Sequence, residues 1–311
     1  MERCGTLKRQ LDPITVHCNS GASPATQPAS ADARPTFLKS VWNPIAIIQL
    51  TKIIREGINP VTAEFMNIAH RGASSYAPEN TFAAYDKALA MGVNHIELDV
   101  HFTSDDHLVV IHDDTVDRTT DGSGPVADHT LGDLRSLDAG SWFGHQYADE
   151  RIPTLGEVLE RYKGRHHFHI EIKARRVPGL ATRTIDMVRG YGVTNDVTIT
   201  SFWKPWIDES RAYAPDIPTG WLVPLGPDSQ WEDSIVDQAL ESGFTQVCPR
   251  ADIVTPEIVK MLHEKGFVVR CHGISNEDLM RHAVECGADG MTINFPDKLV
   301  EYVEYLGAKC G

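Results

Sequence analysis

Glu97 and Asp99 are the residues of this 311-residue chain whose types and spacing most clearly indicate chemistry. They lie two positions apart in the stretch His95–Val100, and the residues between and after them are apolar. Because strand side chains alternate between two faces, both carboxylates share one face and the apolar residues share the other. Burying unpaired carboxylates is costly, so such a pair normally binds a metal, pairs with a cation or lies at a wet strand end. A metal site is therefore the working hypothesis, and an internal ion pair with Arg71 or Lys173 is the alternative.

Polar groups also end three other short apolar runs. These runs are Met66–Gly72, which ends in His-Arg-Gly, Leu108–Asp113, which ends in His-Asp, and His167–Lys173. The last run repeats the alternation, with Glu171 and Lys173 on one face. In barrels of parallel strands, the loops that leave the carboxyl ends of the strands converge on one face, where active sites lie. The pattern predicts a polar layer built from several strand ends.

Strand-like and helix-like segments alternate from residue 66 onward, a pattern typical of β/α units. Helix starts are indicated by a capping box at Thr154–Glu157, by Pro256 after Thr255, and by the acidic turn after Asn276. The predicted strands cover 66–71, 95–100, 108–112, 167–173, 196–202, 218–223, 245–248, 267–271 and 289–293. The list has one strand more than the eight places of a parallel barrel.

The surplus strand is the third, at 108–112. Only seven residues separate Val100 from Leu108, whereas a parallel crossover needs about a dozen. We therefore expect an antiparallel hairpin, with its turn around 104–107 and with Asp99 paired to His112. In either direction, His112 is too close in sequence to Asp99 to lie far from the predicted site.

Five motifs in this order resemble those of the glycerophosphodiester phosphodiesterase family. They are His70–Ala73, Ala77–Thr81, Ile96–Val100, Val110–Asp113 followed by Asp117–Thr120, and Ile170–Lys173. The resemblance covers about residues 66–297, with weaker matches at 200–202, 287–290 and 294–297. It implies an α/β fold, namely a (β/α)8 barrel of the triosephosphate isomerase type. It also implies a divalent metal ion and cleavage of glycerophosphodiesters to glycerol 3-phosphate and an alcohol.

A phosphodiesterase must neutralise the non-bridging phosphate oxygens, activate the attacking hydroxyl and protonate the leaving alkoxide. Glu97, Asp99 and Glu171 offer hard oxygen ligands that suit one Ca²⁺ or Mg²⁺ ion. Arg71 has forked donors that suit phosphate oxygens, and Lys173 supplies a point charge near the metal. With the ion, this cluster is net positive, as an anionic substrate requires, whereas without it the cluster is net negative.

His70 and His112 are the predicted general base and general acid, because imidazole titrates near neutral pH and serves in either role. Which of them is the base stays open, as does the choice between direct attack by water and a cyclic phosphate formed by the substrate's own glycerol hydroxyl. Glu79 is predicted either as a residue that supports the site or as an acidic residue at the start of a helix over 81–91. Structural roles are expected for seven other histidines, namely His95, His101, His129, His145, His166, His263 and His282.

The stretch Phe267–His272 departs from the family pattern, which has a Trp-Thr-Val-Asn sequence at the end of this strand. Here the strand ends in Arg270, Cys271 and His272. We expect the substrate wall to be polar or open where an aromatic ring packs in similar enzymes, with Arg270 or His272 near a more anionic head group. The alternative is that Trp203, Trp206 or Trp221 fills this space.

Composition is ordinary for one large α/β domain with an extension, at 41% hydrophobic and 23% charged residues. A barrel needs about 250 residues, and about that many follow residue 60. The net charge of −14 argues against nucleic acid or an anionic membrane as a partner and leaves a small-molecule glycerophosphodiester as the expected one. Six cysteines without C-x-x-C spacing, and no secretory signal, favour a cytoplasmic location. The oligomeric state is not predicted.

The domain prediction has three parts: a disordered tail over 1–36, a helical extension over 37–64, and the barrel over 65–311. The tail is rich in Ser, Ala, Pro and Thr, and a transit peptide is the alternative reading. An amphipathic helix is expected at 41–57, packed on the barrel or touching a membrane surface. It is too short to span a bilayer, so we expect no stable membrane insertion.

Three functions fit these observations. The leading one is metal-dependent hydrolysis of small glycerophosphodiesters by two-histidine acid–base catalysis. The second is lysophospholipase D-type hydrolysis of single-chain lipid phosphodiesters at a membrane, with 41–57 as the docking element. The third is a non-catalytic barrel that only binds, and the presence of every predicted ligand, acid and base weighs against it.

Overall fold

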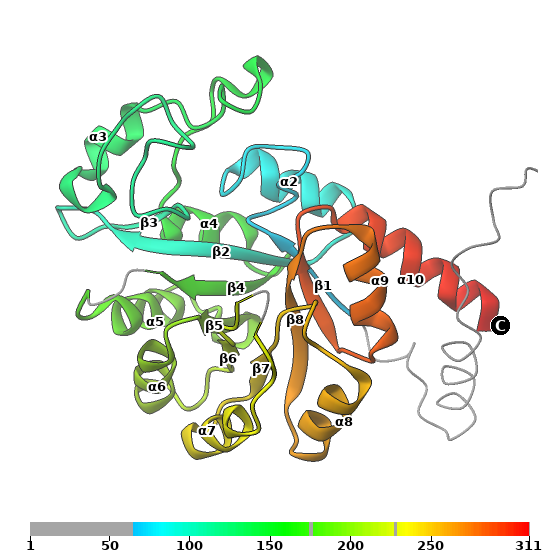
Figure 1. The fold of residues 1–311 in the computed structure, drawn as a ribbon. Helices are drawn as coiled ribbons and strands as arrows, with labels where there is room; N and C mark the ends of the chain where they lie inside the picture. Colours follow the sequence, from blue (N-terminus) through cyan, green and yellow to red (C-terminus); the bar gives the residue numbers. More distant parts are fainter. Residues whose placement is uncertain (1–64, 174–176, 227–228, 311) are drawn as a thin grey trace, which may run out of the picture. The chain divides into compact units, whose positions relative to one another are not determined.

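The fold was analysed in a computed structural model that describes residues 65–173, 177–226 and 229–310 (Figure 1). The predicted tail at 1–36, the extension at 37–64 and the helix at 41–57 lie outside the described residues. None of the described helices is long and apolar enough to cross a membrane.

Eight parallel strands of the described chain close into a barrel, as predicted. The strands are β1 (Met66–His70), β2 (His95–Phe102), β4 (His167–Ile172), β5 (Val197–Ser201), β6 (Thr219–Leu222), β7 (Gln246–Cys248), β8 (Val268–Ile274) and β9 (Gly290–Ile293). Each is hydrogen-bonded to the next, and β1 closes the ring because it pairs with both β9 and β2. The carboxyl ends of all eight strands therefore lie at one end of the barrel.

The remaining strand, β3 (Leu108–Val110), pairs antiparallel with β2, which confirms the predicted hairpin. The predicted pairing of Asp99 with His112 is wrong by one residue. Val100 pairs with Val110, and the Ile111 amide donates to the Asp99 carbonyl at 3.1 Å. The cause is a three-residue turn, in which Asp106 has a φ of 62°, in place of the expected four-residue turn.

Helices follow the strands and pack around the barrel (Figure 1). Their bounds are α2 (Phe82–Ala90), α4 (Leu155–Tyr162), α5 (Leu180–Gly190), α6 (Lys204–Tyr213), α7 (Ser234–Ser242), α8 (Pro256–Glu264), α9 (Glu277–Glu285) and α10 (Pro296–Cys310). The predicted starts are confirmed, since Thr154 forms a capping box with Glu157, and the Thr255 and Asn276 side chains accept from backbone amides of α8 and α9.

A small lobe stands between β3 and α4, and sequence patterns did not predict it. It contains the short helices η1 (Val126–Asp128), α3 (Leu131–Ser136) and η2 (His145–Tyr147), and Figure 1 shows it projecting beside β2 and β3. The lobe has its own apolar cluster of Val109, Ile111, Val116, Val126, Leu134, Ala139 and Ile152. His112 follows directly on Ile111, so this cluster helps to fix where His112 lies.

Strands β2 and β4 each present an apolar face and a polar face, as their alternation predicted. The apolar residues Ile96, Leu98 and Val100 are fully buried in a cluster with residues of the surrounding helices. The residues on the polar faces are His95, Glu97 and Asp99 on β2, and His167, His169 and Glu171 on β4. Histidines therefore occupy the amino ends of both polar faces, and carboxylates occupy the carboxyl ends.

Replacing Leu98 with alanine is expected to lower the free energy of unfolding by about 2–5 kcal/mol. The side chain is 0% exposed, so its removal leaves a cavity between the barrel and the helices. Urea unfolding followed by circular dichroism measures the loss. Leu240→Ala is the matched control, because Leu240 is 45% exposed and its truncation should change the free energy by less than about 0.5 kcal/mol. Equal losses in the two variants would contradict the predicted packing.

Candidate active site

Three carboxylates meet at the carboxyl end of the barrel. Asp99 and Glu171 are direct partners in the β2–β4 register, and Glu97 lies two residues before Asp99. One oxygen of each lies within 4.8 Å of the others, and all three residues are buried. Glu97 Oε1 and Asp99 Oδ1 have no hydrogen-bond partner among the described residues. Three hard oxygen donors, two of them buried with an unused oxygen, fit a divalent cation.

The electrostatics of this cluster favour a cation. Burial and the Asp99 charge raise the pKa of Glu171 to about 7, and burial with both neighbouring carboxylates raises the pKa of Glu97 well above its usual range. Burial opposes ionisation of Asp99 too, but the charges of Arg71 and Lys173 lower its pKa. The cluster thus carries mutual repulsion that a bound divalent ion would relieve.

Arg71 and Lys173 lie against these carboxylates. Arg71 Nε is 3.4 Å from Asp99 Oδ2, and Lys173 Nζ is 3.1 Å from Glu171 Oε1. Asn80, which the sequence analysis did not single out, donates to Asp99 Oδ2 at 3.0 Å. Both basic residues, Arg71 and Lys173, therefore lie at the carboxylate cluster. The predicted metal site and the alternative of an internal ion pair involve the same residues.

The backbone around Arg71 is held in a strained conformation. Arg71 has a φ of 57°, and its amide donates to Glu97 Oε2 at 3.1 Å. Gly72 has a φ of 81°, and a Cβ there would approach the Ala84 backbone to 2.6 Å. This close approach to α2 explains the glycine of the His-Arg-Gly motif. Non-glycine residues in this region of φ cluster at functional sites, where the surrounding contacts offset the strain.

His70, at the end of β1, is fixed through one ring nitrogen. Its Nδ1 lies 2.5 Å from Asn294 Oδ1, an acceptor, so Nδ1 carries the proton and Nε2 keeps its lone pair. Nε2 is 3.9 Å from Glu97 Oε2. Burial and the Arg71 charge lower the pKa of His70 to about 4. At neutral pH the free side chain is therefore a neutral imidazole.

His112 is held from both sides. Its Nδ1 lies 2.5 Å from Asp113 Oδ1, and its Nε2 accepts from Lys173 Nζ at 2.9 Å. Burial lowers the pKa of His112, although the Asp99 charge acts in the opposite direction. A carboxylate that orients one imidazole nitrogen leaves the other for proton transfer, which is the arrangement of a general base.

Glu79 joins two arginines and so ties the lobe to the barrel. It accepts from Arg71 at 2.8 Å and from Arg118 at 2.8 Å through both of its oxygens. Arg118 also donates to Asp113 Oδ2 at 2.6 Å. Glu79 lies before α2, whose first turn contains no acidic residue, and its carboxylate contacts both arginines. The sequence analysis did not single out Arg118, although it stands in one of the quoted motifs.

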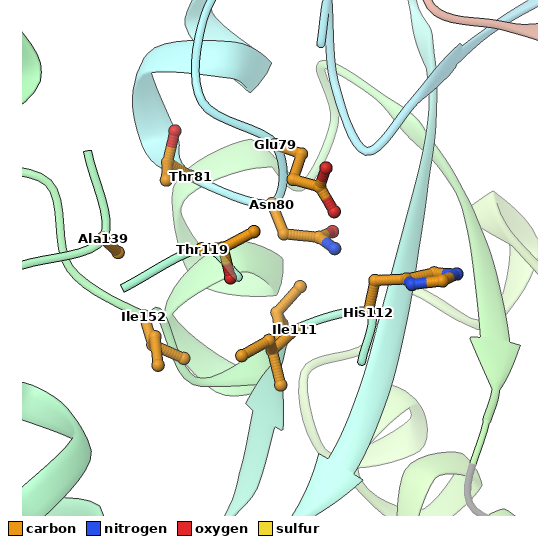
Figure 2. Close-up of a pocket in the computed structure, with 9 residues that line it drawn as sticks. Glu79, Asn80, Thr81, Ile111, His112, Thr119, Ala139 and Ile152 are labelled. Atoms are coloured by element: carbon orange, nitrogen blue, oxygen red, sulfur yellow. The ribbon is translucent and has the colours of Figure 1, made fainter. Parts of the chain in front are cut away.

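A small pocket lies beside His112, between the lobe and the segment that precedes α2. Figure 2 shows Glu79, Asn80 and His112 at this pocket, with Ile111 and Thr119 below Asn80. The lining residues are Glu79, Asn80, Thr81, Val110, Ile111, His112, Thr119, Ala139 and Ile152. Asn80, which donates to Asp99, and Ile111, which precedes His112, thus line the same pocket.

The expected contact of Arg270 with a head group is wrong. Arg270 is buried inside the barrel, where it donates to Gln246 Oε1 and Thr292 Oγ1. His272 instead forms an edge-to-face pair with Phe202, at 5.0 Å between ring centroids, and its Nε2 lies 3.2 Å from the Val223 carbonyl. Trp206 and Trp221 are buried in the apolar core.

Most of the histidines expected to be structural have structural contacts. His101 bonds to the His112 carbonyl, His263 to Asp289, His282 to the Val254 carbonyl and His129 to the Ser123 carbonyl. His166 packs on the ring of Tyr162 at 5.3 Å. His95 differs, since it belongs to a cluster with His167 and His169.

Comparisons with known proteins agree on one family. The model of the glycerophosphoryl diester phosphodiesterase family matches residues 70–298. A glycerophosphodiester phosphodiesterase of Caldanaerobacter subterraneus is 37% identical over 243 residues, which are 77% of this chain and 98% of that protein. One from Bacillus subtilis is 34% identical over 250 residues, or 75% and 84% of the two chains.

Solved structures give the same result. The glycerophosphodiester phosphodiesterase of Agrobacterium tumefaciens superposes with a TM-score of 0.66 at 29% identity, covering 75% of this chain and 98% of that one. A phosphodiesterase of Oleispira antarctica, solved in complex with the product sn-glycerol-3-phosphate, superposes with a TM-score of 0.68 at 28% identity, covering 76% and 96%. The chain therefore belongs to the glycerophosphoryl diester phosphodiesterase family of phosphoric diester hydrolases.

Proposed function

We propose that this protein hydrolyses small glycerophosphodiesters to glycerol 3-phosphate and an alcohol, and that it does so with one divalent cation. The observation that carries the proposal is the buried carboxylate cluster with His70 and His112 at its edge. The glycerol 3-phosphate found in the Oleispira antarctica relative supports the same product here.

Glu97, Asp99 and Glu171 would hold the cation, and their oxygens favour Ca²⁺ or Mg²⁺ over a transition metal. When bound, the ion supplies charge neutralisation and polarises a phosphoryl oxygen. Arg71 and Lys173 lie next to the same carboxylates and would contact the remaining phosphoryl oxygens. Together these residues orient the phosphorus for attack.

His112 would act as the general base. Asp113 accepts from its Nδ1 and stabilises the imidazolium that forms when Nε2 takes a proton from the attacking hydroxyl. The attacking group is either water or the neighbouring glycerol hydroxyl of the substrate. In the free enzyme, Lys173 Nζ donates a hydrogen bond to His112 Nε2. Its ammonium group must therefore turn to the phosphate when substrate binds.

His70 would act as the general acid for the leaving alkoxide. Its free imidazole is neutral at pH 7, because burial and Arg71 disfavour the proton. An anionic phosphodiester beside it favours the imidazolium and so raises its pKa in the complex. Asn294 holds the ring through Nδ1, which directs the proton on Nε2 towards the site.

Removing the cation is expected to lower the rate of glycerol 3-phosphate release from glycerophosphocholine by at least about 100-fold. The reason is that the ion would neutralise the phosphoryl oxygens, and the residues left behind do not replace its charge. The full-length protein is assayed in EDTA and again after Ca²⁺ or Mg²⁺ is restored in excess. An undiminished rate in EDTA would contradict the metal requirement. A folded protein that stays inactive with either ion, but cleaves lysophosphatidylcholine, would favour single-chain lipid substrates.

A further inference from the structure

A second group of metal-ligating side chains lies in the barrel, at the amino ends of β2 and β4. His95 and His167 are the first residues of their strands and are direct partners in the parallel register. His169 follows two residues later on the same face as His167 and is fully buried. The other two rings are partly exposed, so the cluster is reached from the end of the barrel opposite the active site.

The three rings already stand at ligand spacing. Their centroids are 5.1 Å apart for His95 and His167, 5.4 Å for His95 and His169, and 5.0 Å for His167 and His169. His95 Nδ1 lies 3.2 Å from His169 Nε2. A tetrahedral zinc ion with Zn–N bonds of about 2.0–2.1 Å separates its nitrogen ligands by roughly 3.3–3.4 Å. Binding therefore requires little movement of these two nitrogens.

One ring of the cluster is already oriented by a contact of its second nitrogen. His167 Nε2 lies 2.9 Å from Thr198 Oγ1, an orienting hydrogen bond of the kind that metal-bound histidines make through their second nitrogen.

We propose that His95, His167 and His169 bind one zinc ion, at a site separate from the carboxylate cluster. Three imidazoles suit Zn²⁺ or a similar transition metal and do not suit Ca²⁺ or Mg²⁺, which prefer oxygen. The barrel thus holds two sites with different metal preferences. Three protein ligands leave the fourth position of zinc for water or another donor.

One buried charge near the cluster opposes a cation. Arg270 lies inside the same barrel, where it donates to the neutral side chains of Gln246 and Thr292. The affinity of the site for zinc therefore includes the cost of this repulsion.

The experiment is zinc binding by the full-length protein, stripped with EDTA and then titrated against a chromophoric chelator in excess Mg²⁺. His167→Gln and His169→Gln are each expected to weaken zinc binding by at least about 100-fold, because loss of a residue that only supports a ligand already costs about 10–100-fold. His166→Gln is the matched control and should leave the affinity unchanged, since His166 is a buried neighbour outside the cluster.

Two further measurements keep the proposal testable. Zinc at about 100 times its Kd should raise the Tm of the wild type by about 5–10 °C and should leave the Tm of His167→Gln unchanged. Co²⁺ bound in place of zinc should give the visible absorption of a four-coordinate site with imidazole ligands in the wild type only. If His169→Gln does not fold, His167→Gln decides, because its ring is partly exposed. Wild-type zinc affinity in the folded cluster variants, or no zinc uptake by the wild type, would overturn the proposal.

Discussion

Replacing His112 with alanine is expected to lower kcat for glycerophosphocholine by about 10²–10⁴-fold while the protein stays folded. The side chain is partly exposed beyond the end of β3, and its ring contacts are with Asp113 and Lys173. Its loss therefore removes a proton acceptor and leaves the apolar cores intact. Steady-state kinetics with saturating metal measures kcat, and circular dichroism with a thermal melt checks the fold.

The control and a second substrate make this test specific. His129→Ala removes another histidine of the lobe, one whose ring bonds to the Ser123 carbonyl, and should leave kcat unchanged. A glycerophosphodiester with a p-nitrophenol leaving group separates base from acid. His112→Ala should slow both substrates equally, whereas His70→Ala should slow the choline ester far more, because p-nitrophenolate leaves without a proton. A folded His112→Ala enzyme with wild-type kcat would contradict the role of His112 as the base. If His112→Ala slowed the choline ester far more than the p-nitrophenyl ester, and His70→Ala slowed both equally, the two roles would be exchanged.

Replacing Glu97 with glutamine is expected to have opposite effects on activity and on stability without metal. Activity at limiting Ca²⁺ or Mg²⁺ should fall by at least about 100-fold, because a ligand of the proposed cation is lost. The Tm of the metal-free protein at pH 7 should rise. Burial and neighbouring charges raise the pKa of Glu97 above its unfolded value, so its ionised form destabilises the fold. Metal titrations of activity and melts in EDTA measure the two effects.

The pH dependence of these melts follows from the same shifts. Consider an acid whose pKa is higher in the folded state than in the unfolded state. It contributes stability at any pH below its unfolded-state pKa, and this stability is lost as the pH rises through its folded-state pKa. Metal-free wild type should therefore lose stability between about pH 4.5 and 7, as Glu171 ionises, and Glu97→Gln should lose less. Glu264→Gln, at an exposed position of α8, is the control and should match wild type in both assays. A drop in the metal-free Tm of Glu97→Gln would contradict the predicted repulsion.

The polar layer of the barrel could be predicted from the sequence, because the alternation of side chains between the two faces of a strand depends only on neighbouring residues. The period of two places Glu97 with Asp99, and the Glu-x-Lys pattern adds Glu171 and Lys173. The same pattern also contained the histidine cluster, since His95 stands two residues before Glu97. It was missed because each histidine was weighed alone.

Long-range contacts were not readable in this way. His70 is positioned by Asn294, which is 224 residues away in sequence, and Arg118 reaches Glu79 across 39 residues. No local pattern encodes such pairs. The hairpin register also failed, because one residue in the turn at Asp106 shifts every pair that follows. Arg270 was misplaced because a strand end was taken to be solvent-facing, whereas the side chain enters the barrel.

The candidate site draws on two apolar clusters. The carboxylates belong to barrel strands, whereas His112, the proposed base, follows directly on Ile111, whose side chain is part of the lobe's own apolar cluster. The ion pair between Arg118 and Glu79 links the lobe to the barrel. Damage to the lobe's interior, for example at Leu134, should therefore leave cation affinity intact and slow proton transfer. In a screen of variants, a substitution inside the lobe would then lower kcat although it lies far from the phosphate.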